Sequence, residues 1–429
     1  MRYLLSVLRV SHLFGLLFLP SLLAIQVPAS AEEVPGSDMS REHAPQHQEA
    51  MQHDSGHHGG HGAIARGIEN FPTSAYAEDK VVRDIQRPVM PGMQGDPVMG
   101  KKLAASNKGR CLSCHVLDAD GDQAGNVGPN LSSYATSGRS RDYTFQQIWD
   151  ARAHNPSTIM PPFGSNEVLT RHQIMHIVAY LDTLDKPLAE PARPHLASRN
   201  YYVAGEDLTI ADDYIDEGKA LFNKPGNNGK SCASCHTHNL KGVAAYYPKY
   251  DRVLGKVMLI ETRANYCRKR YMHSQPYHLG SHNSNTLSSY IKYMARNAPV
   301  TLASDEATQT ALKKGRDSFY QKTGQLNFAC ADCHDSAAGK WLRGQTLNSI
   351  KPGGKYSYTA ATWPRHFIAL HELGLISLQQ RIRHCQIVTR TYPLKLGSTE
   401  YINMELYITD LARGAPMQAP TMSKMRGED

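Results

Sequence analysis

Three copies of the motif Cys-x-x-Cys-His are the residues of this chain whose types and spacing could do chemistry. The chain has 429 residues and eight cysteines, and six of the cysteines stand in these motifs. The motifs are Cys111/Cys114/His115, Cys232/Cys235/His236 and Cys330/Cys333/His334. Two thiols at this spacing form thioether bonds with the vinyl groups of a haem, and the adjacent histidine supplies the proximal iron ligand. The sequence therefore predicts three covalently bound c-type haems, with His115, His236 and His334 as proximal ligands.

Two other uses of these cysteines fit the sequence less well. A tetrahedral zinc site needs further Cys/His pairs at suitable spacing, and the chain has none. Thioredoxin-like redox chemistry needs a βαβ context, whereas the pattern around these motifs is helical.

The elements that must position the motifs recur three times along the chain. A short helical pattern with a glycine precedes each motif, and an amphipathic helix closes each unit after irregular loops. The closing helices carry apolar residues at helical spacing, namely Ile174, Ile177, Val178 and Leu181, then Leu287, Tyr290, Ile291 and Met294, then Tyr401, Met404, Ile408 and Leu411. This order resembles the class I cytochrome c fold.

We therefore expect an all-α chain of three class I cytochrome c-like domains in tandem, with long irregular loops. The expected domains are residues 91–188, 205–302 and 303–429. A proline-rich stretch at 186–195 indicates a linker, taken as 189–204. No comparable linker separates the second and third domains, so we expect these two to share an interface.

The first 90 residues are predicted to contain a targeting signal followed by a tether. Arg2 and Arg9, the apolar run 13–27 and the small residues 29–31 predict a signal peptide over 1–31, with an uncleaved anchor as the alternative. Residues 32–90 are rich in histidine without apolar periodicity, which predicts a disordered linker; metal binding is the alternative. We expect an exported, periplasmic protein with no membrane span in its mature form.

Each predicted haem iron also needs a sixth ligand or an open position. Met160 precedes two prolines, whose rigid backbone can hold its thioether against the first iron. The two cysteines outside the motifs, Cys267 and Cys385, each follow a motif within its own repeat and are the candidates for the second and third irons. Arg263, Arg268, Lys269 and Arg270 flank Cys267, and Arg381 and Arg383 precede Cys385. Positive charge favours a thiolate.

Two alternatives for these cysteines stay open. The first is a disulfide between Cys267 and Cys385. The second is ligation by histidine in each repeat, from His273, His278 and His282 or from His366, His371 and His384.

The net charge of +8 is mild, and no dense run of basic residues indicates nucleic acid as a partner.

The motifs together resemble a known system. Residues 127–131 and 155–164 resemble the SoxX cytochrome of bacterial sulfur oxidation, and the rest of the chain is similar to the dihaem SoxA subunit. The SoxA resemblance rests on residues 261–268 around Cys267, on the Arg-x-x-x-Cys motif from Arg381 to Cys385, and on residues 405–408 and 414–416. The chain departs from the family in two ways: the two subunits look fused, and His384 stands where the family often has a small residue.

The resemblance implies an L-cysteine S-thiosulfotransferase that joins thiosulfate oxidatively to a cysteine of the carrier SoxYZ. Cys385 would be the active thiol and a haem ligand, Arg381 would bind the oxyanion, and a persulfide could form on Cys385. Electrons would leave through the haems to a small cytochrome c. A thiosulfate dehydrogenase that makes tetrathionate and a non-enzymatic trihaem electron carrier remain the alternatives.

Overall fold

Two helices and their loops enclose each cysteine motif. The computed structural model describes residues 92–118, 124–190, 201–207, 209–237, 240–343, 345–353, 357–366 and 374–423. These residues belong to one unit, Ala63–Asp429. The predicted signal peptide, the histidine-rich linker and most of the linker at 189–204 lie outside the described residues.

The first repeat contains helices α2 (Pro97–Ala105), α3 (Arg141–Trp149) and α4 (Arg171–Leu181). Helix α2 begins at Asp96, whose side chain accepts hydrogen bonds from two backbone amides of the first turn, and Pro97 follows at the first helical position. Helix α4 begins at a capping box formed by Thr170 and Gln173. The four apolar residues predicted on one face of α4 are all buried, so the prediction of this helix is confirmed.

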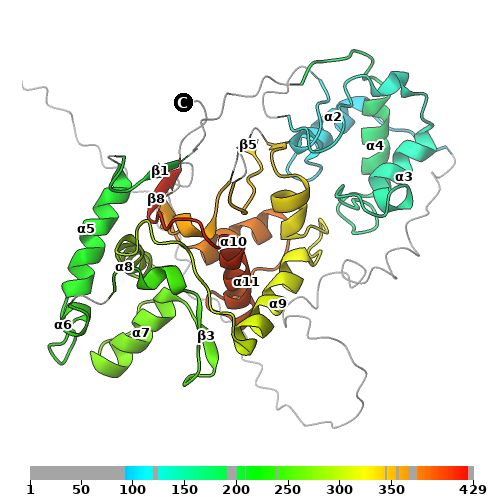
Figure 1. Cartoon of the computed structure of the whole chain (residues 1–429). Helices are drawn as coiled ribbons and strands as arrows, with labels where there is room; N and C mark the ends of the chain where they lie inside the picture. The colour runs from blue at the N-terminus through cyan, green and yellow to red at the C-terminus, as the bar shows by residue number, and fades with distance from the viewer. Residues whose placement is uncertain are drawn as a thin grey trace, which may run out of the picture. The chain divides into compact units, whose positions relative to one another are not determined.

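The second and third repeats follow the same order. The second contains α5 (Ile210–Asn223), α6 (Cys232–Cys235), α7 (Ile260–Tyr271) and α8 (His282–Tyr293), and the third contains α9 (Glu306–Tyr320), α10 (Leu378–Val388) and α11 (Thr399–Asp410). In every repeat the first and last helices pack together, as α2 with α4, α5 with α8 and α9 with α11 (Figure 1).

A buried glycine allows the close crossing of each helix pair. A Cβ atom on Gly100 would lie 2.0 Å from the His176 carbonyl oxygen, and one on Gly315 would lie 2.0 Å from the Asn403 carbonyl oxygen. Gly218 makes the equivalent approach to Thr286, at 2.4 Å. Any side chain at these positions would force the helices apart, which explains the glycine that precedes each cysteine motif.

Short strands accompany the helices, so the prediction of an all-α fold is wrong in this respect. Strands β1 (Tyr201–Val203), β8 (Thr421–Ser423), β6 (Arg365–His366) and β7 (Leu375–Ile376) form a sheet in that order. Two hairpins add β2 (Lys249–Asp251) with β3 (Lys256–Met258), and β4 (Trp341–Leu342) with β5 (Gln345–Thr346). Amphipathic periodicity is not visible in segments of two or three residues, so these strands could not be predicted from the sequence pattern.

Strand β1 also lies within the stretch predicted as a linker. It pairs antiparallel with β8, which brings Tyr201 opposite Ser423 near the far end of the chain. The residues before the second repeat therefore join a sheet made with strands of the third.

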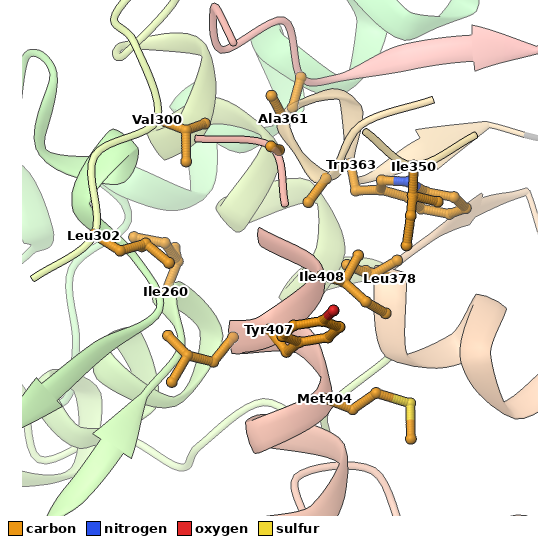
Figure 2. Packing of buried hydrophobic residues seen from close by; sticks show 14 of the residues in the cluster. Ile260, Val300, Leu302, Ile350, Ala361, Trp363, Leu378, Met404, Tyr407 and Ile408 are labelled. Carbon is orange, nitrogen blue, oxygen red and sulfur yellow. The ribbon is translucent and has the colours of Figure 1, made fainter. Parts of the chain in front are cut away.

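The second and third repeats share one hydrophobic core, as predicted. Figure 2 shows Ile260 of α7 and Val300 near Tyr407 and Ile408 of α11, with Leu378 of α10 beside them. The first repeat has a separate core around Phe145 and α4, which also includes Leu326 from the third repeat. Among the described residues, no helix is both long and apolar enough to cross a membrane.

Candidate functional site

The first motif begins with a short 3-10 helix, Cys111–Ser113, which follows the loop after α2. Nδ1 of His115 donates a hydrogen bond to the carbonyl oxygen of Pro129, at 2.7 Å. Because a carbonyl oxygen can only accept, the bond leaves Nε2 free as a metal ligand. Gly128 lies close against the imidazole, since a Cβ there would lie 2.2 Å from Cε1 of His115. The ring is thus held in one orientation.

Met160 is partly buried against the same apolar cluster as Cys111. Its thioether sulfur lies 3.6 Å from Nε2 of Gln147, and its backbone amide donates to the Thr158 hydroxyl at 3.1 Å. Another methionine of the first repeat, Met175, is fully enclosed in the core on α4. The structure thus packs Met160 and Cys111 against the same hydrophobic cluster.

The second motif forms the short helix α6, capped by Ser231. Cys267, on α7, lies close enough to Cys232 to affect the pKa of Cys232, and Cys235 in turn raises the pKa of Cys267. Burial raises the pKa of the Cys267 thiol, and Arg263 only partly opposes this effect. His236 is half-buried. Four of the predicted residues of the second haem site therefore lie in one region.

The third motif begins at Cys330 and continues into a π-helical turn, Asp332–Ser336. Nδ1 of His334 donates to the Asn348 carbonyl oxygen at 2.8 Å, fourteen residues downstream, which is the separation also found between His115 and Pro129. The third repeat therefore fixes its histidine in the same way as the first.

Cys385, on α10, lies against this third motif. It contacts His334 and is close enough to Cys330 and Cys333 to affect their pKa values. Burial by itself raises the pKa of a thiol, but the positive charge of Arg381 and the hydrogen bond with His334 outweigh it and bring the pKa of Cys385 down to about 7. All eight cysteines are free in the structure, and no Cys267–Cys385 disulfide is present.

Arg381 lies one helical turn before Cys385, so the two side chains share one face of α10. Arg383 is exposed. His384 is half-buried, and burial together with Arg381 lowers its pKa. The structure therefore brings the predicted thiol and one of its two flanking arginines to the third motif.

The first repeat contacts the third repeat near their two cysteine motifs. Trp341 and Asn126 exchange two hydrogen bonds, of 2.7 and 2.9 Å. Arg110, directly before Cys111, donates to the Val388 carbonyl oxygen at the end of α10, at 2.8 Å. Cys114 is close enough to Cys333 to contribute to its raised pKa of about 12. The attachment sites of the first and third motifs are thus neighbours.

These surroundings fit covalently attached haem. The cysteines of the first and third motifs are enclosed, which raises the pKa values of Cys111, Cys114, Cys330 and Cys333 to about 12. Each histidine has its Nδ1 held by a backbone carbonyl, and the other ring nitrogen of His334 faces the Cys385 sulfur, a soft donor. Among the described residues, no group of three or more His, Cys, Asp or Glu side chains could hold a metal ion by itself.

Sequence reasoning missed two charged residues that bear on these sites. Asp251, on β2, forms an ion pair with Arg263. Arg365, on β6, is completely buried. An alignment of the second repeat on the third could have found them, because two features recur in both. Arg263-x-x-x-Cys267 and Arg381-x-x-x-Cys385 have the same spacing. A proline followed by a basic residue opens both β2 and β6.

The fold and the motifs define a c-type cytochrome. The cytochrome c family matches residues 98–185, and the family described as "SoxA/TsdA, cytochrome c domain" matches residues 217–300.

Named relatives match about half of the chain. The chain is 34% identical over 213 residues to the L-cysteine S-thiosulfotransferase subunit SoxA of Pseudaminobacter salicylatoxidans, a match that covers 48% of this chain and 71% of the relative. It is 30% identical over 218 residues to the SoxA subunit of Hydrogenobacter thermophilus, covering 49% and 80%. The chain belongs to the SoxA family.

Two solved structures show some likeness. The crystal structure of SoxXA from P. pantotrophus has a TM-score of 0.46 at 27% identity and covers 50% of this chain and 78% of its own. The thiosulfate dehydrogenase TsdBA from Marichromatium purpuratum has a TM-score of 0.28 at 19% identity, with 73% and 70% covered.

Proposed function

We propose that this chain is a natural fusion of a SoxX-like and a SoxA-like cytochrome that acts as an L-cysteine S-thiosulfotransferase in the periplasm. Its substrates are thiosulfate and a cysteine of a SoxYZ-like carrier protein. The observation that carries the proposal is the convergence of Cys385, Arg381 and His334 at the third motif, in a chain of the SoxA family. The proposed domains are 91–188 for the SoxX-like part and 205–302 and 303–429 for the SoxA-like part.

Three haems are attached through the three pairs of motif cysteines. The iron ligands are His115 with Met160, His236 with Cys267, and His334 with Cys385. When bound, the haems supply one-electron carriers that remove electrons from the thiol site. The enclosed thiols and oriented imidazoles described above support this assignment.

Arg381 binds and orients the thiosulfate. Its planar guanidinium offers parallel N–H donors to two sulfonate oxygens. This places the terminal sulfur of thiosulfate toward Cys385, one turn further along α10. The same positive charge favours the thiolate of Cys385.

The reaction then has two steps at Cys385. In the first, a bond forms between the Cys385 thiolate and the terminal sulfur of thiosulfate, and two electrons leave to a small cytochrome c acceptor. In the second, the thiolate of the carrier attacks the transferred sulfur, and Cys385 departs as a thiolate. The sum converts a carrier thiol and thiosulfate into a carrier cysteine S-thiosulfonate, one proton and two electrons. A persulfide on Cys385 is compatible with the same exchange.

The contact between the first and third repeats supports an outward electron route through the first repeat. Cys114 and Cys333 are neighbours, and Asn126, Trp341 and Arg110 join the surfaces around them. Thioether ligation by Met160 favours a higher potential than thiolate ligation does. The second repeat has no part in this route, and we assign it a structural role.

A second candidate function deserves the same test, because the family that matches residues 217–300 is named for both SoxA and TsdA. A dehydrogenase of this kind would join two thiosulfates to tetrathionate. An electron carrier without thiosulfate chemistry would form neither product.

The test is product analysis by mass spectrometry with purified protein, thiosulfate, carrier and a cytochrome c acceptor. The proposal expects the carrier to gain the mass of thiosulfate less one hydrogen, and expects little free tetrathionate. Intact mass of the exported protein is expected to show three haems, a cleaved signal peptide and any extra sulfur on Cys385. Tetrathionate without a carrier adduct would establish the second candidate instead.

A further inference from the structure

The loop that carries Met160 is held both from within the first repeat and from the third repeat. Within the first repeat, Nε2 of Gln147 lies 3.6 Å from the Met160 sulfur, and the Met160 backbone amide donates to the Thr158 hydroxyl at 3.1 Å. From the third repeat, Nζ of Lys322 donates to the carbonyl oxygen of Thr158 at 3.1 Å. Thr158 therefore joins the Lys322 ammonium group to the backbone of Met160.

Lys322 has a second partner inside the third cysteine motif. Its Nζ lies 3.6 Å from Oδ2 of Asp332, which stands between Cys330 and Cys333. Asp332 is buried, and the same oxygen accepts a hydrogen bond from the Ala329 amide at 2.8 Å. Solvent screens a partly buried ion pair less than a surface pair, so the carboxylate of Asp332 keeps the ammonium group close to the motif.

The segment between Lys322 and the third motif is built into the first repeat. Leu326 is buried in the hydrophobic core of the first repeat, and Phe328 packs against the same core. Gln325 and Asn166 exchange two hydrogen bonds, each from a side-chain amide to the other residue's carbonyl oxygen, of 3.2 and 2.9 Å. The contact made by Lys322 is therefore part of a larger interface between the two repeats.

The corresponding lysine of the second repeat faces solvent. Lys224 and Lys322 each stand eight residues before the first cysteine of their motifs. Lys224 is exposed, and Ser234, which takes the place of Asp332 between the two cysteines, is exposed as well. The lysine bridge is therefore particular to the repeat that contacts the first one.

The chain on the other side of Met160 is stiff. Pro161 and Pro162 follow it directly, and the proline ring fixes the backbone φ angle of each. The position of the Met160 sulfur therefore depends on how the residues before it are held. Thr158 is one of these residues, and Lys322 holds its carbonyl group.

We propose that Lys322 is a positioning residue for the first haem, because it ties the loop of Met160 to the attachment motif of the third haem. Methionine ligation in the first repeat then depends on a side chain of the third repeat, and so does the higher potential that thioether ligation favours. The inference rests on the proposed function, since it takes Met160 as the sixth ligand of the first haem.

The test measures how firmly Met160 holds its place, with free imidazole as the competing ligand. Wild-type protein, Lys322→Met and the matched control Lys224→Met are purified with haem, and intact mass confirms three haems in each. The oxidised proteins are titrated with imidazole, and loss of the absorption band of methionine-ligated haem gives the dissociation constant. Lys322→Met should bind imidazole about tenfold more tightly, because a hydrogen bond from a charged donor no longer holds the loop. Lys224→Met should stay within about twofold of the wild-type protein.

Further measurements separate positioning from stability. The reduction potential of the first haem should fall in Lys322→Met, and Lys322→Arg, which restores a charged donor, should recover most of the potential and of the resistance to imidazole. A merely structural role predicts a lower melting temperature with both quantities unchanged. Should Lys322→Met fail to acquire three haems, Lys322→Gln, which is uncharged and one bond shorter, is measured in its place with the same expected shifts.

An unchanged imidazole affinity in a three-haem Lys322→Met protein overturns the inference and leaves ligation by Met160 intact. A wild-type protein with three haems and no methionine band overturns both. Conjugation of thiosulfate to the carrier is measured separately on the wild-type protein, so the result for the proposed transferase activity is independent of the imidazole titration.

Discussion

The second and third repeats build the same framework around two different thiols. Each has an Arg-x-x-x-Cys sequence on a helix that follows a two-stranded hairpin, as Arg263 with Cys267 and Arg381 with Cys385. In the second repeat Asp251 pairs with Arg263, and the pKa of Cys267 is raised. In the third, Arg381 and His334 lower the pKa of Cys385 to about 7. The difference lies in the partners of each thiol, because Arg381 and His334 together outweigh burial at Cys385, whereas Arg263 does not outweigh burial at Cys267.

The second and third repeats also differ in the residue at the position of Asp251. Counting from the proline that opens each hairpin, Asp251 corresponds to Phe367 in the third repeat. The aspartate is lost there, and the exposed Lys249 is replaced by the buried Arg365. The loss of the aspartate removes a negative charge, and the change from lysine to arginine places a positive charge in the interior instead of on the surface.

The largest expected effect separates the two cysteines. Cys385→Ser should retain three covalent haems but lower the rate of carrier conjugation by about a thousandfold or more, because the sulfur that accepts thiosulfate is gone. Cys267→Ser should alter the spectrum of the second haem and lower the rate far less. Conjugation rates and visible spectra of both variants are the measurement. Equal losses in the two variants would contradict the division of roles.

The next effect concerns the two arginines. Arg381→Gln should lower kcat/KM for thiosulfate by about a hundredfold, the size found for removal of one donor to a developing or bound oxyanion. Arg263→Gln breaks only a partly exposed ion pair with Asp251, so its kcat/KM should stay within about twofold. If Arg263→Gln were as damaging as Arg381→Gln, the second repeat would have to take part in catalysis.

The same substitution at the helix crossing of each repeat should lower the free energy of unfolding by a similar amount. Gly218→Ala and Gly315→Ala each place a methyl group against a backbone carbonyl of the partner helix, and each should cost about 2–3 kcal/mol of unfolding free energy. Urea unfolding of the haem-loaded protein measures this cost, with exposed Lys314→Ala as the control on α9. A loss in only one repeat would show that the helix crossings are not equivalent.

The smallest expected effect is a pH dependence of stability that arises between the second and third repeats. Glu405 on α11 is buried, and burial together with Glu261 on α7 raises its pKa to about 7, although Lys292 on α8 and Gln379 on α10 oppose the shift. The folded protein therefore holds a proton that the unfolded chain releases at lower pH, so stability should fall as pH rises from about 4 to 7.

The variant Glu405→Gln should remove that slope, because its side chain cannot ionise. Melting temperatures measured across the same pH range test this, and Glu400→Gln, an exposed position on the same helix, should keep the slope. A slope that survives in Glu405→Gln would assign it to other groups.

The sequence by itself determined the repeats. The spacing of Cys111, Cys114 and His115 and its two copies specified the haem motifs, because thioether attachment is local chemistry. The spacing of Ile174, Ile177, Val178 and Leu181 specified a buried helix face, because the period of a helix is a local property. The Arg-x-x-x-Cys spacing likewise predicts that the arginine and the cysteine share one face of a helix.

The tertiary structure decided which charges meet. The pairing of Asp251 with Arg263 spans two elements, and the burial of Arg365 depends on strands from both ends of the chain. Short strands carry no periodic signal, and the neighbours of a side chain across a sheet are not written in its own segment. Local pattern therefore predicted where each thiol lies, whereas the environment that lowers the pKa of Cys385 and raises that of Cys267 came from contacts between distant residues.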